Sequence, residues 1–460
     1  MKGSKIIPGS FRDPSGFIFT SGGMIYRQVN HVYRNNYDFL INSGLFKSLT
    51  EEGLLIPHED AFAVTPAPDT AYKIIKPLHI PFISYPYEWC FSQLKRAAMA
   101  TLEIQKKCLD FGMSLKDSSA YNIQFLKGKA VFIDTLSFEK YVEGVPWVAY
   151  RQFCQHFLAP LALMSYRDTR LNQLLKIHLD GIPLDLAGPL LPYRTRLNPS
   201  LFMHIHLHAR AQKHFSDRKV TVRKDRVSRL SLMGLIDNLE STVAKMHWKP
   251  GGTEWADYYS ETNYSGTAFS HKKQLVSDFL DKLKPGIVWD MGSNTGEFSR
   301  IASVKNRQVI SFDVDPAAVE KNYLKCVEEK EVNILPLLLD LTNPSPATGW
   351  NNTERMSLTE RGPADTALAL ALVHHMAISN NVPFEKIADF LHDICNSLII
   401  EFIPKEDSQV KRLLINREDI FKDYSRGAFE SGFQNFFTII KAENVKDSGR
   451  IIYMMEKRQD

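Results

Sequence analysis

The chain has 460 residues, of which 44% are apolar, 11% aromatic and 23% charged. This composition excludes a largely disordered, collagen-like or coiled-coil protein, and the length predicts two or three domains. The net charge of +4 divides unevenly, since residues 1–250 carry +11 and residues 251–460 carry −7. No apolar run of about 18 residues, signal-peptide core or CxxC pair occurs, so we expect a cytoplasmic protein with buried thiols and no membrane span.

The first half begins with strand and turn patterns. Residues 16–20 and 24–29 flank Ser21-Gly22-Gly23 and predict a hairpin. A helix is expected from about 36 to 52, ending at Gly53, and short strands are expected at 71–76 and 80–85. The apolar spacing over 91–111 predicts one amphipathic helix that ends at Gly112, and residues 150–215 are expected to be mostly helical.

Three polar residues follow the helix over 91–111. Asp117 and Asn122 are five residues apart, and Asp134 comes twelve residues later, after a short apolar strand. This spacing, with a hinge-like segment at 85–89, resembles divergent small-molecule and sugar kinases over about residues 15–215. The resemblance implies that Asp117 orients a hydroxyl nucleophile, and that Asn122 and Asp134 hold Mg²⁺ beside ATP.

The kinase pattern has departures. No GxGxxG loop is present, and Arg27 stands where strand three of a kinase carries lysine. Lys116 replaces the histidine before Asp117, and Thr135 replaces the phenylalanine after Asp134. Three interpretations therefore stay open: a catalytic kinase, a non-catalytic kinase-like scaffold, and chance spacing in an unrelated helical domain.

Two further features precede the second half. His204, His206 and His208 would share one face of a strand and bind metal, whereas in a helix only His204 and His208 align, and polar packing is the expected role. No metal site is therefore predicted. The basic residues of 210–229 are either a solvated helix face or a contact for a phosphate-bearing partner, such as nucleic acid or an anionic glycan or lipid.

A linker at 249–252 divides the chain into predicted domains 1–249 and 250–460. Strands are expected at 286–290, 308–313, 334–339, 365–372 and 397–402, with helices at 270–283, 296–304, 316–328 and 383–394. This alternation predicts an α/β domain with helices on both faces of a parallel sheet. Residues 436–442 and 450–455 predict an antiparallel hairpin at the end.

The first of these strands runs into a glycine-containing loop, Asp290-Met-Gly292-Ser-Asn294-Thr-Gly296. Glycines let a ligand lie against the backbone, while a carboxylate just before the loop repels phosphates and attracts a cation. The pattern therefore favours a positively charged nucleoside cofactor. Further acids follow the next two strands, Asp313 and Asp340. Over about residues 255–460 the sequence resembles class I S-adenosylmethionine-dependent methyltransferases, whose first motif has the form (D/E)xGxxxG.

The resemblance implies a role for each residue of this constellation. Gly292, Asn294 and Gly296 would line the methionine and ribose of S-adenosylmethionine. Asp290 would approach its amino group, Asp313 its ribose hydroxyls and Asp340 its adenine amine.

Other candidates surround this site. His374 and His375, after the fourth strand, either orient or deprotonate the methyl acceptor or serve capping and packing. Glu401 is a weaker candidate, and Tyr258, Tyr259 and Tyr264 form either a lid or interface packing.

The whole chain is thus expected to join an α+β kinase-like domain to a Rossmann-like, seven-stranded methyltransferase domain with a C-terminal antiparallel hairpin. It resembles a bacterial two-part family labelled as nodulation-related or ribosomal-protein methyltransferases. The methyl acceptor is not identified by the sequence. Two alternatives remain: a bifunctional kinase–methyltransferase that modifies a glycan or lipid end group, and an interaction protein that binds the cofactor without turnover.

Overall fold

The structure, a computed structural model, describes residues 4–208, 227–251, 266–415 and 418–459. The chain forms two compact units. The first holds Met1–Lys249 and the short segment Gly349–Arg355, and the second holds Pro250–Thr348 and Met356–Asp460. Within the described ranges, no helix is both long enough and apolar enough to cross a membrane.

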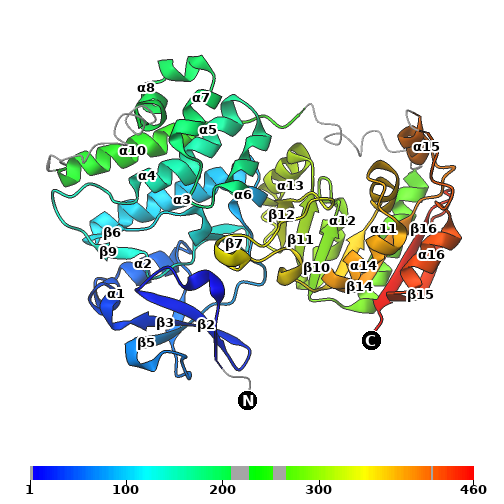
Figure 1. Cartoon of the computed structure of the whole chain (residues 1–460), viewed down its shortest axis with the longest axis horizontal. Coiled ribbons are helices and arrows are strands. Elements are labelled where there is room, and N and C mark those ends of the chain that lie inside the picture. The colour runs from blue at the N-terminus through cyan, green and yellow to red at the C-terminus, as the bar shows by residue number, and fades with distance from the viewer. Residues whose placement is uncertain (1–3, 209–226, 252–265, 416–417, 460) are drawn as a thin grey trace. The chain divides into compact units, whose positions relative to one another are not determined.

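The first unit begins with a five-stranded antiparallel sheet in the order β1-β2-β3-β5-β4. Two short helices, α1 and α2, follow β3 in the chain, and Figure 1 shows them beside this sheet (blue). A small core that includes Val29, Tyr37 and Ile75 joins β3, β5 and α1. The bounds are β1 Lys5–Ile6, β2 Gly16–Ser21, β3 Met24–Asn30, α1 Arg34–Asn42, α2 Leu45–Glu51, β4 His58–Asp60 and β5 Ala71–Pro77.

A long helix and two strand pairs come next. Helix α3, Phe91–Asp110, confirms the predicted amphipathic helix, and its buried residues recur along one face. Strand β6 (Met113–Leu115) pairs with β9 (Phe138–Lys140), and β7 (Ile123–Leu126) pairs with β8 (Lys129–Phe132). The expectation of mostly helical structure over 150–215 is confirmed as far as residue 208, where the described segment ends. The helices of the described residues after β9 are α4 Tyr150–Phe153, α5 Ala159–Tyr166, α6 Leu174–Ile177, α7 Leu184–Leu190, α8 Pro199–Leu201 and α10 Arg229–Lys245.

Two expectations for this unit are wrong. Residues 80–85 form no strand, because the backbone of Ser84 is bonded to the side chain of Gln124 instead of to a neighbouring strand. The nearby Pro81 and Pro86 also lack an amide donor. The single helix expected over 36–52 is two helices, because Gly44 takes a left-handed conformation between them, with φ of 84°.

The second unit is built on a seven-stranded sheet in the order β12-β11-β10-β13-β14-β16-β15. The first five strands in this order are parallel, and β16 runs antiparallel to both β14 and β15. The predicted parallel strands and closing hairpin are therefore confirmed. The bounds are β10 Ile287–Met291, β11 Gln308–Asp313, β12 Ile334–Leu338, β13 Ala364–Ala369, β14 Cys395–Phe402, β15 Phe437–Asn444 and β16 Ile451–Lys457.

Helices cover both faces of this sheet (Figure 1). Every second residue of a strand faces the same side of the sheet. On one side, Val288 of β10 and Ile399 of β14 belong to one core cluster with Phe279 of α11. On the opposite face, the ring of Tyr453 packs 5.1 Å from that of Phe429 on α16. The helices are α11 Gly266–Leu283, α12 Glu297–Ser303, α13 Pro316–Glu328, α14 Phe384–Ile394, α15 Ser408–Leu414 and α16 Arg426–Gln434.

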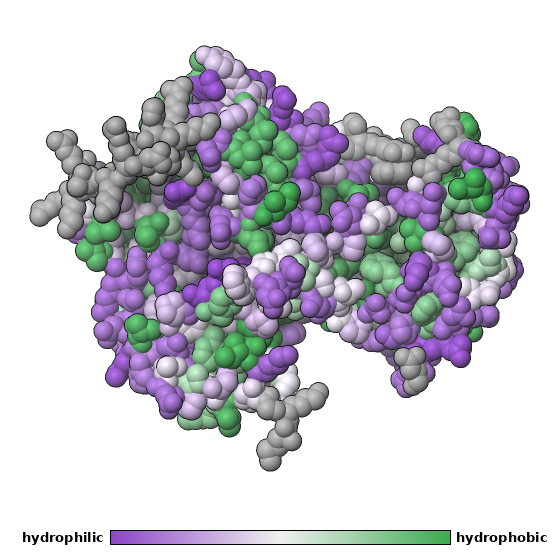
Figure 2. All heavy atoms as spheres, viewed as in Figure 1, coloured by the Kyte–Doolittle hydropathy of each residue, from purple (hydrophilic) through white to green (hydrophobic). Residues whose placement is uncertain are grey.

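The surface is mixed in character. On the face drawn in Figure 2, apolar and polar side chains are interleaved. Exposed apolar residues such as Val142, Val145 and Val148 are of the kind that soluble proteins normally carry. All five cysteines are buried and none forms a disulfide, as predicted for thiols without a disulfide framework.

Candidate functional site

The carboxyl ends of four neighbouring strands, β10, β11, β12 and β13, surround one cavity in the second unit. Its volume is about 360 Å³, within the range of small-molecule sites. Strand β10 pairs with β11 on one side and with β13 on the other, so the cavity lies where the strand order reverses. That is the expected place for a ligand in an open α/β sheet.

Asp290, at the end of β10, lies in the floor of this cavity and is 2% exposed. Its Oδ2 accepts a hydrogen bond from Ser299 Oγ at 2.6 Å. Burial raises the pKa of Asp290 to about 7, and the neighbouring Asp313 adds to the increase. The ionised carboxylate is therefore costly here until a cation approaches it.

Asp313, at the end of β11, is held by backbone amides. Its Oδ2 accepts from the amide of Asn294 at 2.7 Å, and its Oδ1 accepts from that of Asp315 at 2.9 Å. Burial raises the pKa of Asp313 to about 6, although these amide bonds act in the opposite direction. The amide of Val314 also bonds this carboxylate, which has about four lone-pair sites, so about one site remains for a hydroxyl group of a ligand.

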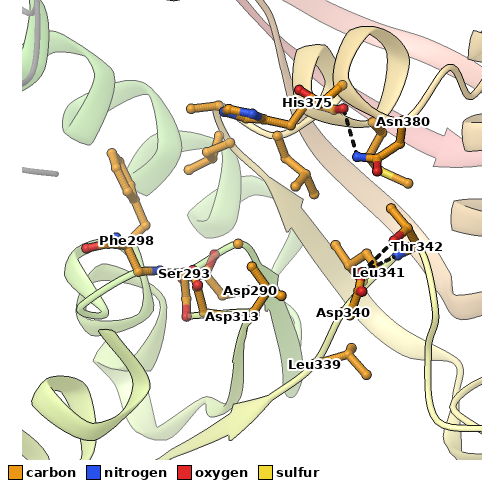
Figure 3. A pocket seen from close by; sticks show the side chains of 18 of the residues that line it. Asp290, Ser293, Phe298, Asp313, Leu339, Asp340, Leu341, Thr342, His375 and Asn380 are labelled. Atoms are coloured by element: carbon orange, nitrogen blue, oxygen red, sulfur yellow. Dashed lines mark hydrogen bonds between the residues drawn. The ribbon is translucent and has the colours of Figure 1, made fainter. Parts of the chain in front are cut away.

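Asp340 lies just beyond β12 and is exposed at the cavity wall. Its Oδ1 accepts from both the amide and the hydroxyl of Thr342, at 2.8 and 2.7 Å. Figure 3 shows Asp340 with Thr342 on one side of the cavity and Asp290 with Asp313 on another. The structure therefore brings together the three acids that the sequence singles out.

The two glycines of the loop have different surroundings. Gly292 lines the cavity, as Asn294 does, and a Cβ atom on Gly292 would meet Leu372 Cδ1 at 3.4 Å. Gly296, which the sequence assigns to the cofactor, lies outside the wall of this cavity. A Cβ atom there would clash with the Asn322 side chain, so this glycine serves the close packing of α12 on α13.

The adjacent histidines also differ. His375 lines the cavity, whereas His374 is buried behind it and 2% exposed. Figure 3 shows His375 and Asn380 together, with Asn380 Nδ2 donating to the His375 carbonyl at 3.1 Å. Burial lowers the pKa of His375 to about 4, and it lowers that of His374 further, so both rings are neutral at pH 7.

Sequence reasoning misses Lys272, a cavity residue on α11. Its Nζ lies 2.6 Å from Oε2 of Glu401, and both side chains are almost completely buried. A lysine within the apolar pattern of a helix is expected at the surface. The only sequence signal for this ion pair is Glu401, an acid near the end of a buried strand.

In the first unit, the pairings β6–β9 and β7–β8 bring Asp117, Asn122 and Asp134 together. The carboxylate of Asp117 is bonded by the Asn122 side chain, and burial raises its pKa, as does the charge of Asp134. Oδ1 of Asp134 lies 2.5 Å from Arg27 Nη2, and its Oδ2 accepts from Ser137 Oγ at 2.5 Å. Arg27 thus reaches this cluster from β3.

The three histidines near residue 206 are bonded to other side chains, and His208 shares the hydroxyl of Tyr150 with His204, at 3.1 Å from its Nε2. His204 bonds Asn238 through Nε2 at 2.8 Å and Tyr150 through Nδ1 at 2.7 Å, while His206 bonds Thr195 at 2.9 Å. No group of three or more His, Cys, Asp or Glu residues in the described part of the chain is placed to hold a metal ion. Residues 209–226 of the basic stretch and the three tyrosines near 260 lie outside the described residues.

A comparison with models of known protein families finds no match. Among curated proteins, the chain is 36% identical over 464 residues to the nodulation protein NoeA of Rhizobium meliloti (strain 1021). That alignment covers 98% of this chain and 96% of the relative.

Solved structures resemble less than half of the chain. Magnesium protoporphyrin IX methyltransferase (ChlM) of Synechocystis PCC 6803 with bound SAH is 16% identical, with coverage of 44% of this chain and 93% of that one and a TM-score of 0.31. The N-methyltransferase NodS of Bradyrhizobium japonicum WM9 is 8% identical, with coverage of 42% and 99% and a TM-score of 0.31. WbdD, crystallised with a kinase inhibitor, is 16% identical, with coverage of 45% and 43% and a TM-score of 0.30. TM-scores this low carry no argument about activity. The function of this chain must follow from the residues of its own cavity.

Proposed function

The chain belongs to the family of the nodulation protein NoeA. For this family member we propose the transfer of a methyl group from S-adenosylmethionine to an acceptor. The observation that carries this proposal is the convergence of Asp290, Asp313 and Asp340 on one cavity at the switch point of the sheet. The name of the relative links that protein to nodulation and leaves the acceptor unassigned.

The chemistry of the cavity fits this cofactor. S-adenosylmethionine carries a sulfonium, an ammonium, ribose hydroxyls and an adenine amine, and when bound it supplies an activated methyl group. Asp290 provides a buried negative charge that an ammonium stabilises. Asp313 retains an acceptor site for a hydroxyl group, and the exposed Asp340 accepts from an amine. The chain thus offers an acceptor for each donor group of the ligand.

On the acceptor side, His375 is the residue placed to accept a hydrogen bond from the methyl acceptor. Its ring is neutral at pH 7, because burial holds its pKa at about 4, so it accepts a hydrogen bond from a hydroxyl or an uncharged amine. Methyl transfer chiefly requires the nucleophile to be aligned with the methyl group, so His375 acts first by orienting the acceptor. His374, behind the cavity wall, supports this turn by packing.

Cofactor binding is tested by titrating the full chain with S-adenosylhomocysteine in a calorimeter. Loss of the charged hydrogen bonds in Asp313→Ala is expected to weaken the affinity by about 10- to 100-fold. Asp393→Ala, on the exposed side of α14, is the control and should leave the affinity unchanged. Equal affinity of the Asp313→Ala and wild-type proteins would refute the assignment of Asp313 to the ribose.

Turnover is tested with S-adenosylmethionine labelled on its methyl group and an extract of cells that lack this gene. Labelled product and S-adenosylhomocysteine are expected with the wild-type chain and not with Asp290→Asn. Binding without any transfer would instead favour an interaction protein that uses the fold to bind the cofactor.

A second activity, phosphoryl transfer in the first unit, is favoured by the gathering of Asp117, Asn122 and Asp134. In this proposal Asp117 orients a hydroxyl nucleophile, while Asn122 and Asp134 hold Mg²⁺ with ATP. The order of β6 to β9 around these residues supports it, and so does the contact of Arg27 with Asp134. The bonds from Arg27 and Ser137 to Asp134 also fit a scaffold that has no nucleotide.

These two possibilities are separated by titrating the full chain with ATP in the presence and absence of Mg²⁺. A nucleotide site predicts Mg²⁺-dependent binding that Asp134→Asn weakens by tenfold or more, and a scaffold predicts no binding. A bifunctional enzyme further predicts that Asp117→Asn blocks methylation in extracts while S-adenosylhomocysteine still binds. Full methylation by that variant contradicts a joint reaction sequence.

A further inference from the structure

Glu401 is a carboxylate with no exposed surface, near the end of β14, an interior strand of the sheet. Its Oε2 accepts from Lys272 Nζ at 2.6 Å and from the backbone amide of Ala371 at 2.8 Å. Its Oε1 lies 3.8 Å from Nη1 of Arg450. Burying such charges costs free energy that their mutual attraction offsets only in part, so a network of this kind requires an explanation other than stability.

The bond to Ala371 fixes a strained turn in the cavity wall. Ala371 has φ of 51°, a left-handed conformation that is strained for a residue with a Cβ atom. It stands between Leu370 and Leu372, and all three line the cavity. The carbonyl of Leu372 in turn accepts from the amide of His375 at 3.0 Å. Glu401 is therefore connected, through one turn, to the histidine that faces the acceptor.

The same carboxylate is connected to two other walls. Lys272 on α11 lines the cavity, with its Nζ 4.9 Å from the centre of the Phe298 ring. Arg450 donates to both oxygens of Asp407, from Nε at 2.8 Å and from Nη2 at 3.2 Å. Asp407 caps α15, the helix that places Leu413 in the cavity. Three separate elements thus meet at Glu401.

We propose that Glu401 is a positioning residue for methyl transfer, which holds the Leu370–Leu372 turn and with it His375 against the acceptor. The inference rests on the function proposed above. Ala371 would leave its strained conformation without the hydrogen bond from its amide to Glu401. In this proposal the bond keeps the turn in place, and the turn in place aligns the acceptor. Asp290 and Asp313 lie on other strands, β10 and β11. The charge of Lys272 lowers the pKa of Asp290, so the effect of the Ala371 bond is isolated by comparing two proteins that both lack Lys272.

Two double variants isolate the bond between Glu401 and Ala371. Both remove the ion pair with Lys272→Met, so that no unpaired charge stays buried. In one, Glu401→Gln keeps an acceptor for the Ala371 amide, and in the other, Glu401→Leu removes it. Asp281→Asn is the matched control, because it breaks a pair with the buried Arg307 at the opposite edge of the sheet.

The measurements are labelled methyl transfer into an extract of cells that lack the gene and the affinity for S-adenosylhomocysteine. The variant with leucine is expected to transfer more slowly than that with glutamine by about 10- to 100-fold, the effect of a misplacement of about 1 Å. The affinity of the leucine variant for S-adenosylhomocysteine is expected to stay within about twofold of that of the glutamine variant. The Ala371 amide resonance of protein labelled with ¹⁵N-alanine should move in the leucine variant only.

Equal rates for the two double variants overturn the proposal, and so does an affinity loss as large as the rate loss. Ala371→Val provides a second route if the leucine variant does not fold. A β-branched residue disfavours the φ of 51° more strongly than alanine does, so this variant displaces the turn without changing any charge, and its rate is expected to fall about tenfold. A wild-type rate for Ala371→Val also overturns the proposal. If the wild-type chain transfers no methyl group, it is the proposed function that fails, which the Asp281→Asn and wild-type assays reveal first.

Discussion

Asp290 combines complete burial with a charge that cofactor binding requires. Its pKa of about 7 in the folded protein is above that of an unfolded aspartate, about 3.9. The folded state therefore binds more protons than the unfolded state between these values, and the free energy of unfolding falls as the pH rises through this window. The site is thus built at the expense of stability near neutral pH.

We expect Asp290→Asn to stabilise the cofactor-free protein, because it removes a buried negative charge while Asn Oδ1 still accepts from Ser299. The gain should be larger at pH 8 than at pH 5 by roughly 2 kcal/mol, as the shift of the pKa implies. Thermal unfolding at the two pH values measures it, with Asp278→Asn on the exposed face of α11 as the control. A gain of equal size at both pH values would contradict the assignment.

The same carboxyl group sets a pH dependence of cofactor binding. Only ionised Asp290 attracts the amino group of the ligand, so the affinity for S-adenosylhomocysteine should rise from pH 5.5 to about 7.5 and then level off. Binding should release protons near pH 6.5, which calorimetry in buffers of different ionisation enthalpy detects. No proton release would indicate that the ligand avoids Asp290.

At this scale the sequence predicted which acids follow successive strands but not which of two adjacent side chains faces the ligand. Asp290, Asp313 and Asp340 stand at fixed places after buried runs, so parallel pairing is enough to bring them together. His374 and His375 lie at the start of an irregular helical turn, where periodicity does not predict the direction of either ring. Lys272 was missed because its partner is 129 residues away.

At the scale of elements, the two glycines of the loop before α12 separate effects on stability from effects on cofactor binding. Gly296 begins α12 with φ of 83° and touches Asn322 on α13, so Gly296→Ala should destabilise the protein by about 2–3 kcal/mol. Gly292 is also left-handed, with φ of 81°, but a Cβ atom there would only contact Leu372 Cδ1 at 3.4 Å, so Gly292→Ala should destabilise the protein less than Gly296→Ala and should weaken S-adenosylhomocysteine binding as well. Melting curves and titrations of both variants test this division. Equal effects of the two variants on stability would contradict it.

The elements of the second unit were predictable because its strands are continuous apolar runs covered on both faces. In the first unit the same reasoning failed at residues 80–85, where a buried glutamine, Gln124, takes the backbone bonds that a strand would need. The break at Gly44 was also missed, because a glycine within a helical pattern predicts a stop only when its conformation is known.

On the scale of the whole molecule, the segment Gly349–Arg355 is the feature that no sequence pattern announces. It is secured in the first unit by Glu354, whose carboxylate accepts from Arg12 Nη2 at 2.6 Å. Arg355 stacks over the ring of the buried Tyr121, with its Cζ 4.4 Å from the ring centre. Such local contacts depend on a loop between two strands of the other unit, and periodicity carries no information about them.

We expect Arg355→Ala to destabilise the first unit by about 1–2 kcal/mol through loss of this cation–π contact. Hydrogen exchange should become faster around Tyr121, while the affinity for S-adenosylhomocysteine stays unchanged. Lys386→Ala, on the exposed surface of α14, is the control. Unchanged exchange at Tyr121 would show that the stacked guanidinium is dispensable.

This segment also means that the gene cannot be divided cleanly at the codon for Pro250. A fragment of residues 1–249 would lack one of its own pieces, and a fragment of residues 250–460 would carry that piece without a place for it. Each half alone should therefore expose apolar surface and aggregate, whereas the two expressed together should recover a soluble complex. The peptide chain passes three times from one unit to the other. The two units could be encoded by separate genes only if the segment Gly349–Arg355 no longer belonged to the first unit.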